Sequence, residues 1–532
     1  MSLSLDRISN VATKSRQQFV YCAALLVCCL LSPILFSEIG IVGEVYIGAH
    51  AEQVPYVLEQ TAPLEWSDRS NGLIRAASTR PMLRIQFGDS WWPLMINTYT
   101  GGLADWPGRL FMKLGGKVQY ARWFYSVWGG LSCIILFVML QQHLRIRYAF
   151  WTALCVALAW DLALYRTTLA GTEQMLQLVW ALCLLFWLRK EDGRIWGILV
   201  CIGVFTKITF LFSLIPLWLV MAYQNRQSAL RWLSLGMLIG AIPLVALSLP
   251  NGIPSHDLLS MQFDRLFHAF QGKNTASREH WQNLYLWLIS PQQFWAEHYH
   301  LAPVTLPILR NVGLLLLGIS TVVCWRQDSP AISTVRQIAS ITIVQAFLLT
   351  WLAKDIHHLA PINISMAIWL GFLIAHLSTQ TARWAKIMKF SVLCIWPIGA
   401  LQVLVQTPSL WSTLNSHGLS ERTQTKICQL LDETQPSMVM TLDYDIYGVI
   451  ESRCPNHKVR HSWGRIAQVR QKAVRPSVEA INPTHLLIFL DSPNWIYNLS
   501  PKQHELEQML PRHQVTSVAI EDQVHLYSLK ER

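Results

Sequence analysis

Long apolar runs alternate with short basic loops along the first 405 residues of the chain. Several of the runs approach the roughly 20 residues that a membrane-spanning helix needs. We therefore expect a polytopic α-helical membrane protein with about 11 transmembrane helices. The predicted spans are 18–37, 122–141, 147–165, 172–188, 195–206, 209–222, 232–249, 308–325, 337–353, 359–377 and 390–406.

The apolar run at 196–223 is too long for one ordinary span, and both of its flanks are basic. Two short helices that break near Thr206 and Lys207 satisfy both observations. Such a break at membrane depth is tolerated where the chain is packed in protein or lines a cavity. Lys207 is therefore a candidate functional residue, and we expect it near Arg166 and Glu173 rather than facing lipid.

Two long polar segments, at 37–121 and 250–307, interrupt the apolar pattern on the predicted outer side. A simple tether between two spans needs only a few residues. The first segment carries acids just beyond the first span, and its part at 101–115 is amphipathic. The second alternates aromatic and polar residues, which is typical of helices that lie in the membrane interface. We interpret the first segment as half of an active site on the outer membrane face.

The composition changes after residue 405, which divides the chain into a membrane domain at 1–405 and a domain at 406–532. The second domain is predicted to be a small α/β domain outside the membrane. An amphipathic helix is expected at 419–432, and another helix at 503–509. Short apolar runs of strand type lie at 437–442, 485–490, 515–520 and 524–529.

Composition and charge support this division. Only 14% of the residues are charged and the mean hydropathy is +0.29, whereas soluble domains carry roughly 25% charged residues. Most of the net charge of +11 lies in loops between alternate spans, which is the positive-inside pattern and not a nucleic-acid-binding stripe. The N-terminus is thus predicted to be cytoplasmic and the C-terminal domain extracytoplasmic. The residues assigned to the inner side are Arg7, Lys14, Arg16, Arg145, Arg147, Arg189, Lys190, Arg194, Arg226, Arg231, Arg326, Arg336, Arg383, Lys386 and Lys389.

Glu44 is the leading candidate for a catalytic base, because it lies just past the first span. A carboxylate that is partly desolvated at the interface can take a proton from a hydroxyl group. A solvated loop acid or a helix cap is the alternative interpretation. Glu38 and Glu52 are rivals within the same loop, and His50 can pair with either of them.

Glu173 and Asp89 are the other candidate catalytic acids. Glu173 opens the fourth span and follows Arg166 in the same short loop; the alternative is an acid that only stabilises a helix N-terminus. Asp89 comes just before Trp91 and Trp92, and a turn residue is the alternative there.

Candidate ligands for an anionic group are Lys207, Arg166, His357 and His358. Two adjacent histidines can bind phosphate, a metal or neither, and a metal site normally needs further ligands. The sequence therefore assigns no metal ligand, and it leaves open whether the protein needs a divalent metal ion. The sequence contains no Walker phosphate loop, no dinucleotide fingerprint and no zinc-protease motif, which argues against an ATP-driven pump.

Five stretches carry a family resemblance, and they follow one another in a defined order and on defined sides of the predicted membrane. They are Gly43-Glu44-Val45-Tyr46, the segment from Trp92-Pro93-Leu94-Met95 to Gly116, Ala121-Arg122-Trp123, Phe205-Thr206-Lys207-Ile208-Thr209 and His357-His358-Leu359-Ala360-Pro361. Together they resemble the GT-C superfamily of polyprenyl-phosphate-sugar-dependent glycosyltransferases, nearest to the branch of protein O-mannosyltransferases and lipid A aminoarabinose transferases.

The chain departs from the family pattern at two places. Gly43 precedes Glu44 where the family usually has aspartate. Trp91-Trp92-Pro93 stands where the family often has Lys-Pro-Pro, so a phosphate-binding lysine is missing there. Binding of the donor would then depend on Lys207, Arg166 or the histidine pair.

The resemblance implies a glycosyltransferase of a bacterial inner membrane. It would move a sugar from a polyprenyl-phosphate donor to an acceptor glycan, lipid or protein on the outer face, with membrane lipids but no nucleic acid as further partners. Two alternatives are a lipid-linked glycan flippase and a catalytically degenerate GT-C-like scaffold for envelope assembly. A transporter is expected to show repeat symmetry and charges midway through several spans, whereas the acids here cluster at one face.

The cysteines separate into two groups. Cys428 and Cys454 lie in the predicted external domain, where an oxidising compartment favours a disulfide. We expect their Cα atoms to be about 5.5 Å apart; two unrelated core thiols are the alternative. The other nine lie in predicted spans, where they pack as apolar residues, and they are Cys22, Cys28, Cys29, Cys133, Cys155, Cys183, Cys201, Cys324 and Cys394.

Overall fold

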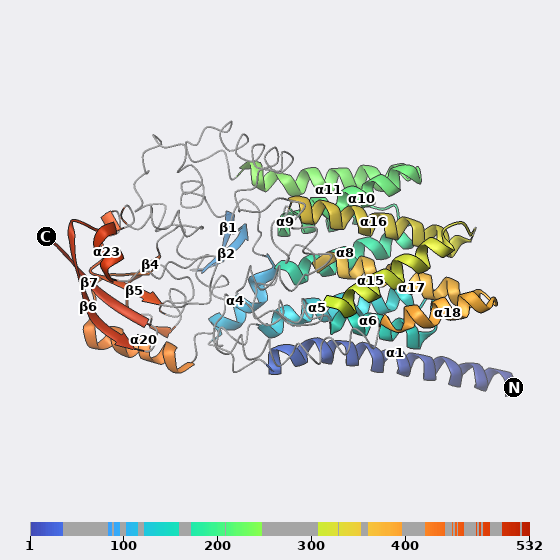
Figure 1. Ribbon diagram of the computed structural model, residues 1–532, viewed down its shortest axis with the longest axis horizontal. Helices are drawn as coiled ribbons and strands as arrows, with labels where there is room; N and C mark the ends of the chain where they lie inside the picture. The colour runs from blue at the N-terminus through green and yellow to red at the C-terminus, as the bar shows by residue number, and fades with distance from the viewer. Residues whose placement is uncertain are drawn as a thin grey trace.

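The protein consists of a bundle of helices at one end and a small sheet module at the other (Figure 1). The N-terminus lies at the far end of the bundle, and the C-terminus lies in the module. The computed structural model describes residues 2–35, 83–87, 90–95, 103–114, 122–158, 172–207, 209–246, 307–327, 329–352, 360–395, 421–441, 450, 453–454, 456–461, 475, 478–479, 482–489, 503–521 and 524–532.

The bundle is built around α8, which contacts α5, α9 and α17 and is buried along most of its length. Each predicted span overlaps a helix of the bundle, because each apolar run can satisfy its backbone groups internally only as a helix. The helices are α1 (Ser2–Leu35), α5 (Arg122–Leu140), α6 (Ile146–Ala157), α8 (Thr172–Leu188), α9 (Ile195–Thr206), α10 (Phe210–Tyr223), α11 (Gln227–Ala246), α15 (Pro307–Cys324), α16 (Pro330–Leu352), α17 (Ala360–Thr379) and α18 (Arg383–Leu393).

Two of the described helical segments, Pro330–Leu349 and Pro361–Thr379, are by length and composition sufficient to cross a membrane. Seven other apolar helical segments of the described chain are shorter, for example Ile195–Thr206 and Phe210–Tyr223. The number of membrane crossings and their orientation stay predictions.

The predicted inner loops gather at the end of the bundle where α1 begins (Figure 1). Gln18 of α1 donates a hydrogen bond to Gln141 in the α5–α6 connection (2.8 Å). Gln224, in the α10–α11 connection, donates to Gln337 near the start of α16 (2.9 Å). The basic loops therefore share one end of the bundle, as a positive-inside distribution requires.

Four helices begin several residues before the predicted spans, at Ser2, Gln227, Pro330 and Arg383. At the start of α16, the hydroxyl of Ser329 accepts a hydrogen bond from the backbone N–H of Ile332 (3.2 Å), and Pro330 occupies the first helical position. A hydropathy pattern ends at the first basic residue, whereas a capped helix continues through basic residues on an exposed side. As starts of helices, the boundaries predicted at 18, 232, 337 and 390 were therefore wrong.

Helices α9 and α11 approach each other closely through small residues. A Cβ atom built on Gly236 would lie 2.4 Å from the carbonyl oxygen of Gly197, and one on Gly240 would lie 2.7 Å from Cβ of Val204. Glycines that allow such backbone contact are common between helices in membranes. This contact fixes α9, whose C-terminal end carries Lys207.

Replacing Gly236 with alanine is expected to lower the thermal unfolding midpoint in detergent. The added methyl group meets backbone atoms, and overpacking of this kind costs about 1–3 kcal/mol. Gly318→Ala is the matched control, because a Cβ atom at Gly318 in α15 meets nothing within 4 Å. Equal midpoints for Gly236→Ala and the wild type would show that α9 and α11 are not packed through this contact.

The C-terminal module contains a five-stranded sheet in the order β4-β3-β5-β7-β6. β3 is parallel to β4 and β5, whereas β7 is antiparallel to β5 and β6. The strands and helices are α20 (Glu421–Thr434), β3 (Val439–Thr441), β4 (Val459–His461), β5 (His485–Phe489), α23 (Gln503–Met509), β6 (His513–Glu521) and β7 (Val524–Glu531).

Both faces of this sheet are covered. Leu487 packs with Leu431 of α20 in one apolar cluster, while its neighbours Leu486 and Ile488 pack with Leu506 of α23 in another. Adjacent residues of a strand point to opposite faces, so the uninterrupted apolar run in β5 serves both clusters. The predicted helices and the strands around 439, 485, 515 and 524 are confirmed, and β4 was missed.

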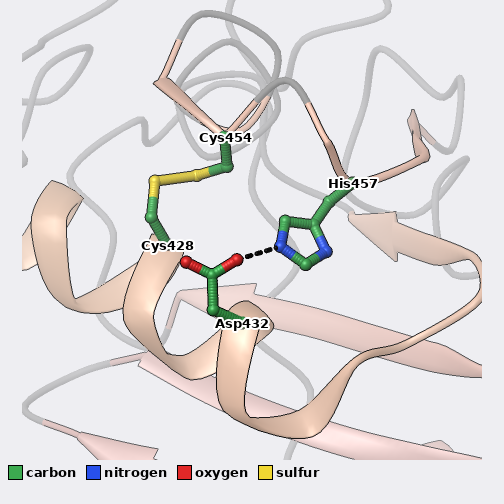
Figure 2. The surroundings of a disulfide bond; sticks show 4 residues. All are labelled: Cys428, Asp432, Cys454 and His457. Carbon is green, nitrogen blue, oxygen red and sulfur yellow. Dashed lines mark hydrogen bonds and ion pairs between the residues drawn. A yellow bond between two sulfur atoms is a disulfide. The ribbon is translucent and has the colours of Figure 1, made fainter.

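Two links join α20 to the chain that follows β3 (Figure 2). Cys428 and Cys454 form a disulfide with their Cα atoms 5.4 Å apart, which confirms the predicted pairing. One turn further along α20, a carboxylate oxygen of Asp432 lies 2.7 Å from Nε2 of His457. The nine cysteines of the predicted spans, all within the described residues, form no disulfide.

Loss of the disulfide is expected to destabilise the C-terminal module by about 3 kcal/mol, because the bridge closes a loop between residues 26 apart. The measurement is thermal unfolding of the full chain for Cys428→Ser with Cys454→Ser, with and without a reductant in the wild type. Cys394→Ser, at a free thiol, is the control. An unfolding profile that neither the double replacement nor the reductant changes would contradict the predicted contribution.

Candidate functional site

The site is built on the break between α9 and α10. Helix α9 ends at Thr206, Lys207 has extended backbone angles (φ −161°, ψ 127°), and α10 begins at Phe210. The N–H of Phe210 bonds to the carbonyl oxygen of Lys207 (3.0 Å). The predicted break near Thr206 and Lys207 is therefore confirmed.

Glycine permits the chain to turn back at this point. The ring of Phe210 lies close to Gly203: a Cβ atom built on Gly203 would be 2.3 Å from a carbon of the ring. The same ring packs edge-on against Trp180 of α8, with the centroids 6.1 Å apart. The first turn of α10 is thus held between α9 and α8.

Lys207 forms a buried ion pair with Glu173. Its Nζ atom hydrogen-bonds to Oε1 of Glu173 in the first turn of α8. Only 4% of the Lys207 side chain and 7% of the Glu173 side chain are exposed. The prediction that Lys207 avoids lipid and lies beside Glu173 is confirmed, and the sequence did not reveal that the two residues bind each other.

Two glutamines extend this polar group along α8. Gln174 and Gln177 are fully buried, and neither the oxygen nor the nitrogen of their amides has a hydrogen-bond partner in the described part of the chain. Sequence reasoning missed both. The available signal was a pair of amides one helical turn apart near the N-terminal end of an otherwise apolar helix.

A second polar chain crosses the bundle deeper along α8. Nε1 of Trp180 donates to the hydroxyl of Ser365 (2.8 Å), and that hydroxyl donates to Oε1 of Gln345 (2.9 Å). The amide nitrogen of Gln345 donates to Ser213 (2.9 Å). These bonds join α8, α17, α16 and α10, and every member has a partner, in contrast to Gln174 and Gln177.

Part of the first long loop packs against α8. The turn η2 (Leu103–Asp105) contacts α8, and Trp128 of α5 donates a hydrogen bond to the carbonyl oxygen of Ala104 (3.4 Å). Helix α4 (Trp106–Lys113) follows and confirms the amphipathic segment predicted at 101–115.

An unpredicted hairpin precedes η2. β1 (Leu83–Phe87) pairs antiparallel with β2 (Ser90–Met95). Trp92 packs against Trp106 of α4 with the ring centroids 5.5 Å apart, and Phe87 packs against both tryptophans. The two-residue connection at 88–89, which begins with glycine, was the signal for this hairpin.

Several predicted site residues lie outside the described part of the chain. They are Glu44, Asp89, Arg166, His357 and His358, with the rivals Glu38, Glu52 and His50. Of the seven residues assigned to catalysis or phosphate binding, the structure therefore places Glu173 and Lys207, and it brings these two together. Among the residues that the structure describes, no group of three or more His, Cys, Asp and Glu side chains is arranged to hold a metal ion.

The helical bundle with its C-terminal sheet module has a fold similar to that of a solved structure. It is similar to the crystal structure of ArnT from Cupriavidus metallidurans in the apo state, with a TM-score of 0.53 and 11% identity over 97% of this chain and 98% of that chain. An apo oligosaccharyltransferase from Archaeoglobus fulgidus aligns with a TM-score of 0.45 and 11% identity over 88% of this chain and 69% of that chain. No protein-family model matches the sequence, and no curated protein matches it. The resemblance predicted from the sequence is thus confirmed at the level of the fold.

Proposed function

We propose that this protein is a multi-pass membrane glycosyltransferase that moves a sugar from a polyprenyl-phosphate donor to an acceptor glycan, lipid or protein. The N-terminus would be cytoplasmic, and the C-terminal module and the site would face the outside. The observation that carries the proposal is the buried Glu173–Lys207 pair at the break between α9 and α10. The fold shared with ArnT is consistent with it.

The length of α9 favours a lipid-linked phosphate as the ligand of Lys207. A helix of 12 residues is about 18 Å long, whereas the hydrocarbon core of a bilayer is about 30 Å thick. If α9 starts at the inner interface, Lys207 lies below the outer surface, at a depth where a lysine needs an anionic partner. A phosphate that is anchored by a polyprenyl chain can reach this depth.

The reaction can then be written with named residues. An oxygen atom of the acceptor attacks the anomeric carbon, and the bond from that carbon to the phosphate oxygen breaks. Glu44 takes the proton of the acceptor hydroxyl, and Lys207 stabilises the negative charge on the departing polyprenyl phosphate. Glu173 holds the ammonium group of Lys207 in place, while Arg166, His357 and His358 are proposed further phosphate ligands and Asp89 a further acid.

A flippase and a non-catalytic scaffold are the competing functions. A flippase needs charged groups along its transport route. Within the described bundle, the buried pair of Glu173 and Lys207 lies at the end of α8 that is proposed to face outward. Charged groups at one end of the bundle, rather than along a route through it, favour chemistry at one face.

The proposal is tested with the full-length protein in nanodiscs and a polyprenyl monophosphate that carries a radiolabelled sugar. Transfer of label to an acceptor, with equimolar release of polyprenyl phosphate, is the expected result. Protein-dependent movement of the intact donor across a proteoliposome membrane without cleavage would instead establish the flippase. Donor binding with neither cleavage nor movement would establish the scaffold.

A further inference from the structure

The side-chain amides of Gln174 and Gln177 have hydrogen-bonding atoms that no described residue satisfies. Buried polar groups in proteins are nearly always hydrogen-bonded, and a buried group without a partner is destabilising. Here two amides are fully buried, and their two oxygens and two nitrogens are all unpartnered among the described residues. The residues that bear them lie next to Glu173 and one turn beyond it.

The chemistry of an amide limits what can satisfy it. An amide oxygen only accepts hydrogen bonds and an amide nitrogen only donates them. A phosphate group offers acceptors alone and would leave both oxygens unpaired. A hydroxyl group both donates and accepts, so neighbouring hydroxyl groups can satisfy both atoms of an amide at once.

The position of the amides connects them to the ion pair. Helical side chains lean toward the N-terminus of their helix, so both amides are carried toward the end of α8 where Glu173 binds Lys207. One helical turn is about 5.4 Å, which is similar to the width of a sugar ring. A sugar that is attached to a phosphate at Lys207 is therefore within reach of the amides.

We propose that Gln174 and Gln177 bind hydroxyl groups of the transferred sugar and determine which sugar the protein accepts. This inference rests on the proposed function, because it takes the donor phosphate to lie at Lys207. The two amides contribute to recognition of the sugar and not to binding of the lipid phosphate.

Methionine has nearly the shape of glutamine and lacks its hydrogen-bonding groups, so Gln174→Met and Gln177→Met are the test variants. Because the amides have no partner among the described residues, neither variant should lower the thermal unfolding midpoint of the free protein. Gln345→Met is the matched control. It should lower the midpoint, since its amide is bonded to Ser213 and Ser365.

Binding is measured in nanodiscs with two kinds of probe, bare polyprenyl monophosphate and a panel of polyprenyl monophosphates that carry hexoses and amino-pentoses. The wild type should prefer at least one sugar-bearing lipid over the bare lipid. Each variant should reduce that preference about five- to tenfold, the effect of a typical hydrogen bond, and leave the affinity for the bare lipid unchanged. Binding of the free sugar, without a lipid, is measured as well, because it would reveal a separate acceptor site.

Each other outcome overturns the inference in a recognisable way. The wild type can bind the bare lipid while both variants keep its preference for sugar-bearing lipid, or the wild type can show no such preference. In either case the amides do not select the sugar, and the proposed function stands. If the variants weaken binding of free sugar alone, the amides belong to an acceptor site. If the variants lose as much thermal stability as Gln345→Met, the amides have a structural role. If the wild type binds no polyprenyl phosphate of any kind, the inference and the proposed function both fail.

Discussion

Replacing Lys207 with methionine is expected to lower the rate of sugar transfer about 100- to 1000-fold. That is the usual loss when one preorganised group that stabilises developing charge is removed from a site sheltered from water. The ammonium group of Lys207 is buried against Glu173 at the end of a short helix, so no solvent cation can readily take its place. The measurement is the turnover number with saturating donor lipid.

A stability control separates the loss of chemistry from the loss of structure. Lys207→Met leaves the carboxylate of Glu173 buried without this partner, which typically costs about 3–5 kcal/mol. Adding Glu173→Gln removes that charge and should restore the unfolding midpoint while transfer stays absent. If the double variant regains transfer together with stability, Lys207 serves only to neutralise Glu173, and its role at the phosphate is wrong.

Glu44→Gln is expected to abolish sugar transfer, with a loss of about 100- to 10,000-fold, because glutamine cannot accept the proton of the acceptor hydroxyl. Membrane insertion and the unfolding midpoint should remain those of the wild type. Binding of bare polyprenyl phosphate should also be unchanged, since this residue is proposed to act on the acceptor.

Glu38→Gln and Asp89→Asn are the matched variants, because each removes one carboxylate from the same long loop. Both are expected to transfer sugar faster than Glu44→Gln. Near-normal turnover by Glu44→Gln, together with loss of turnover in one of the other two, would assign the base to that residue.

The sequence predicted the elements that depend on local patterns. The break at Lys207 followed from a run too long for one span with basic residues at both ends. α20 followed from its amphipathic pattern, and α23 from a short run of helical type. The disulfide followed from the small number of cysteines outside the spans.

Features that depend on contacts between distant residues could not be predicted in this way. β4 is three residues long and exists because it pairs with β3. The hairpin of β1 and β2 is a local exception: proline disfavours an interior strand, and β2, which contains Pro93, has a single partner in a two-stranded ribbon. The pairing of Glu173 with Lys207 depends on how α8 and α9 cross, which no periodicity specifies.

The order of strands in the C-terminal module has a consequence for how the protein is made. β7 (Val524–Glu531) follows β5 and β6 in the chain but lies between them in the sheet. Until β7 has been synthesised, β6 has no strand beside it and β5 is exposed along one edge. β7 therefore completes the sheet, and a truncation within β7 would remove an interior strand rather than trim a tail.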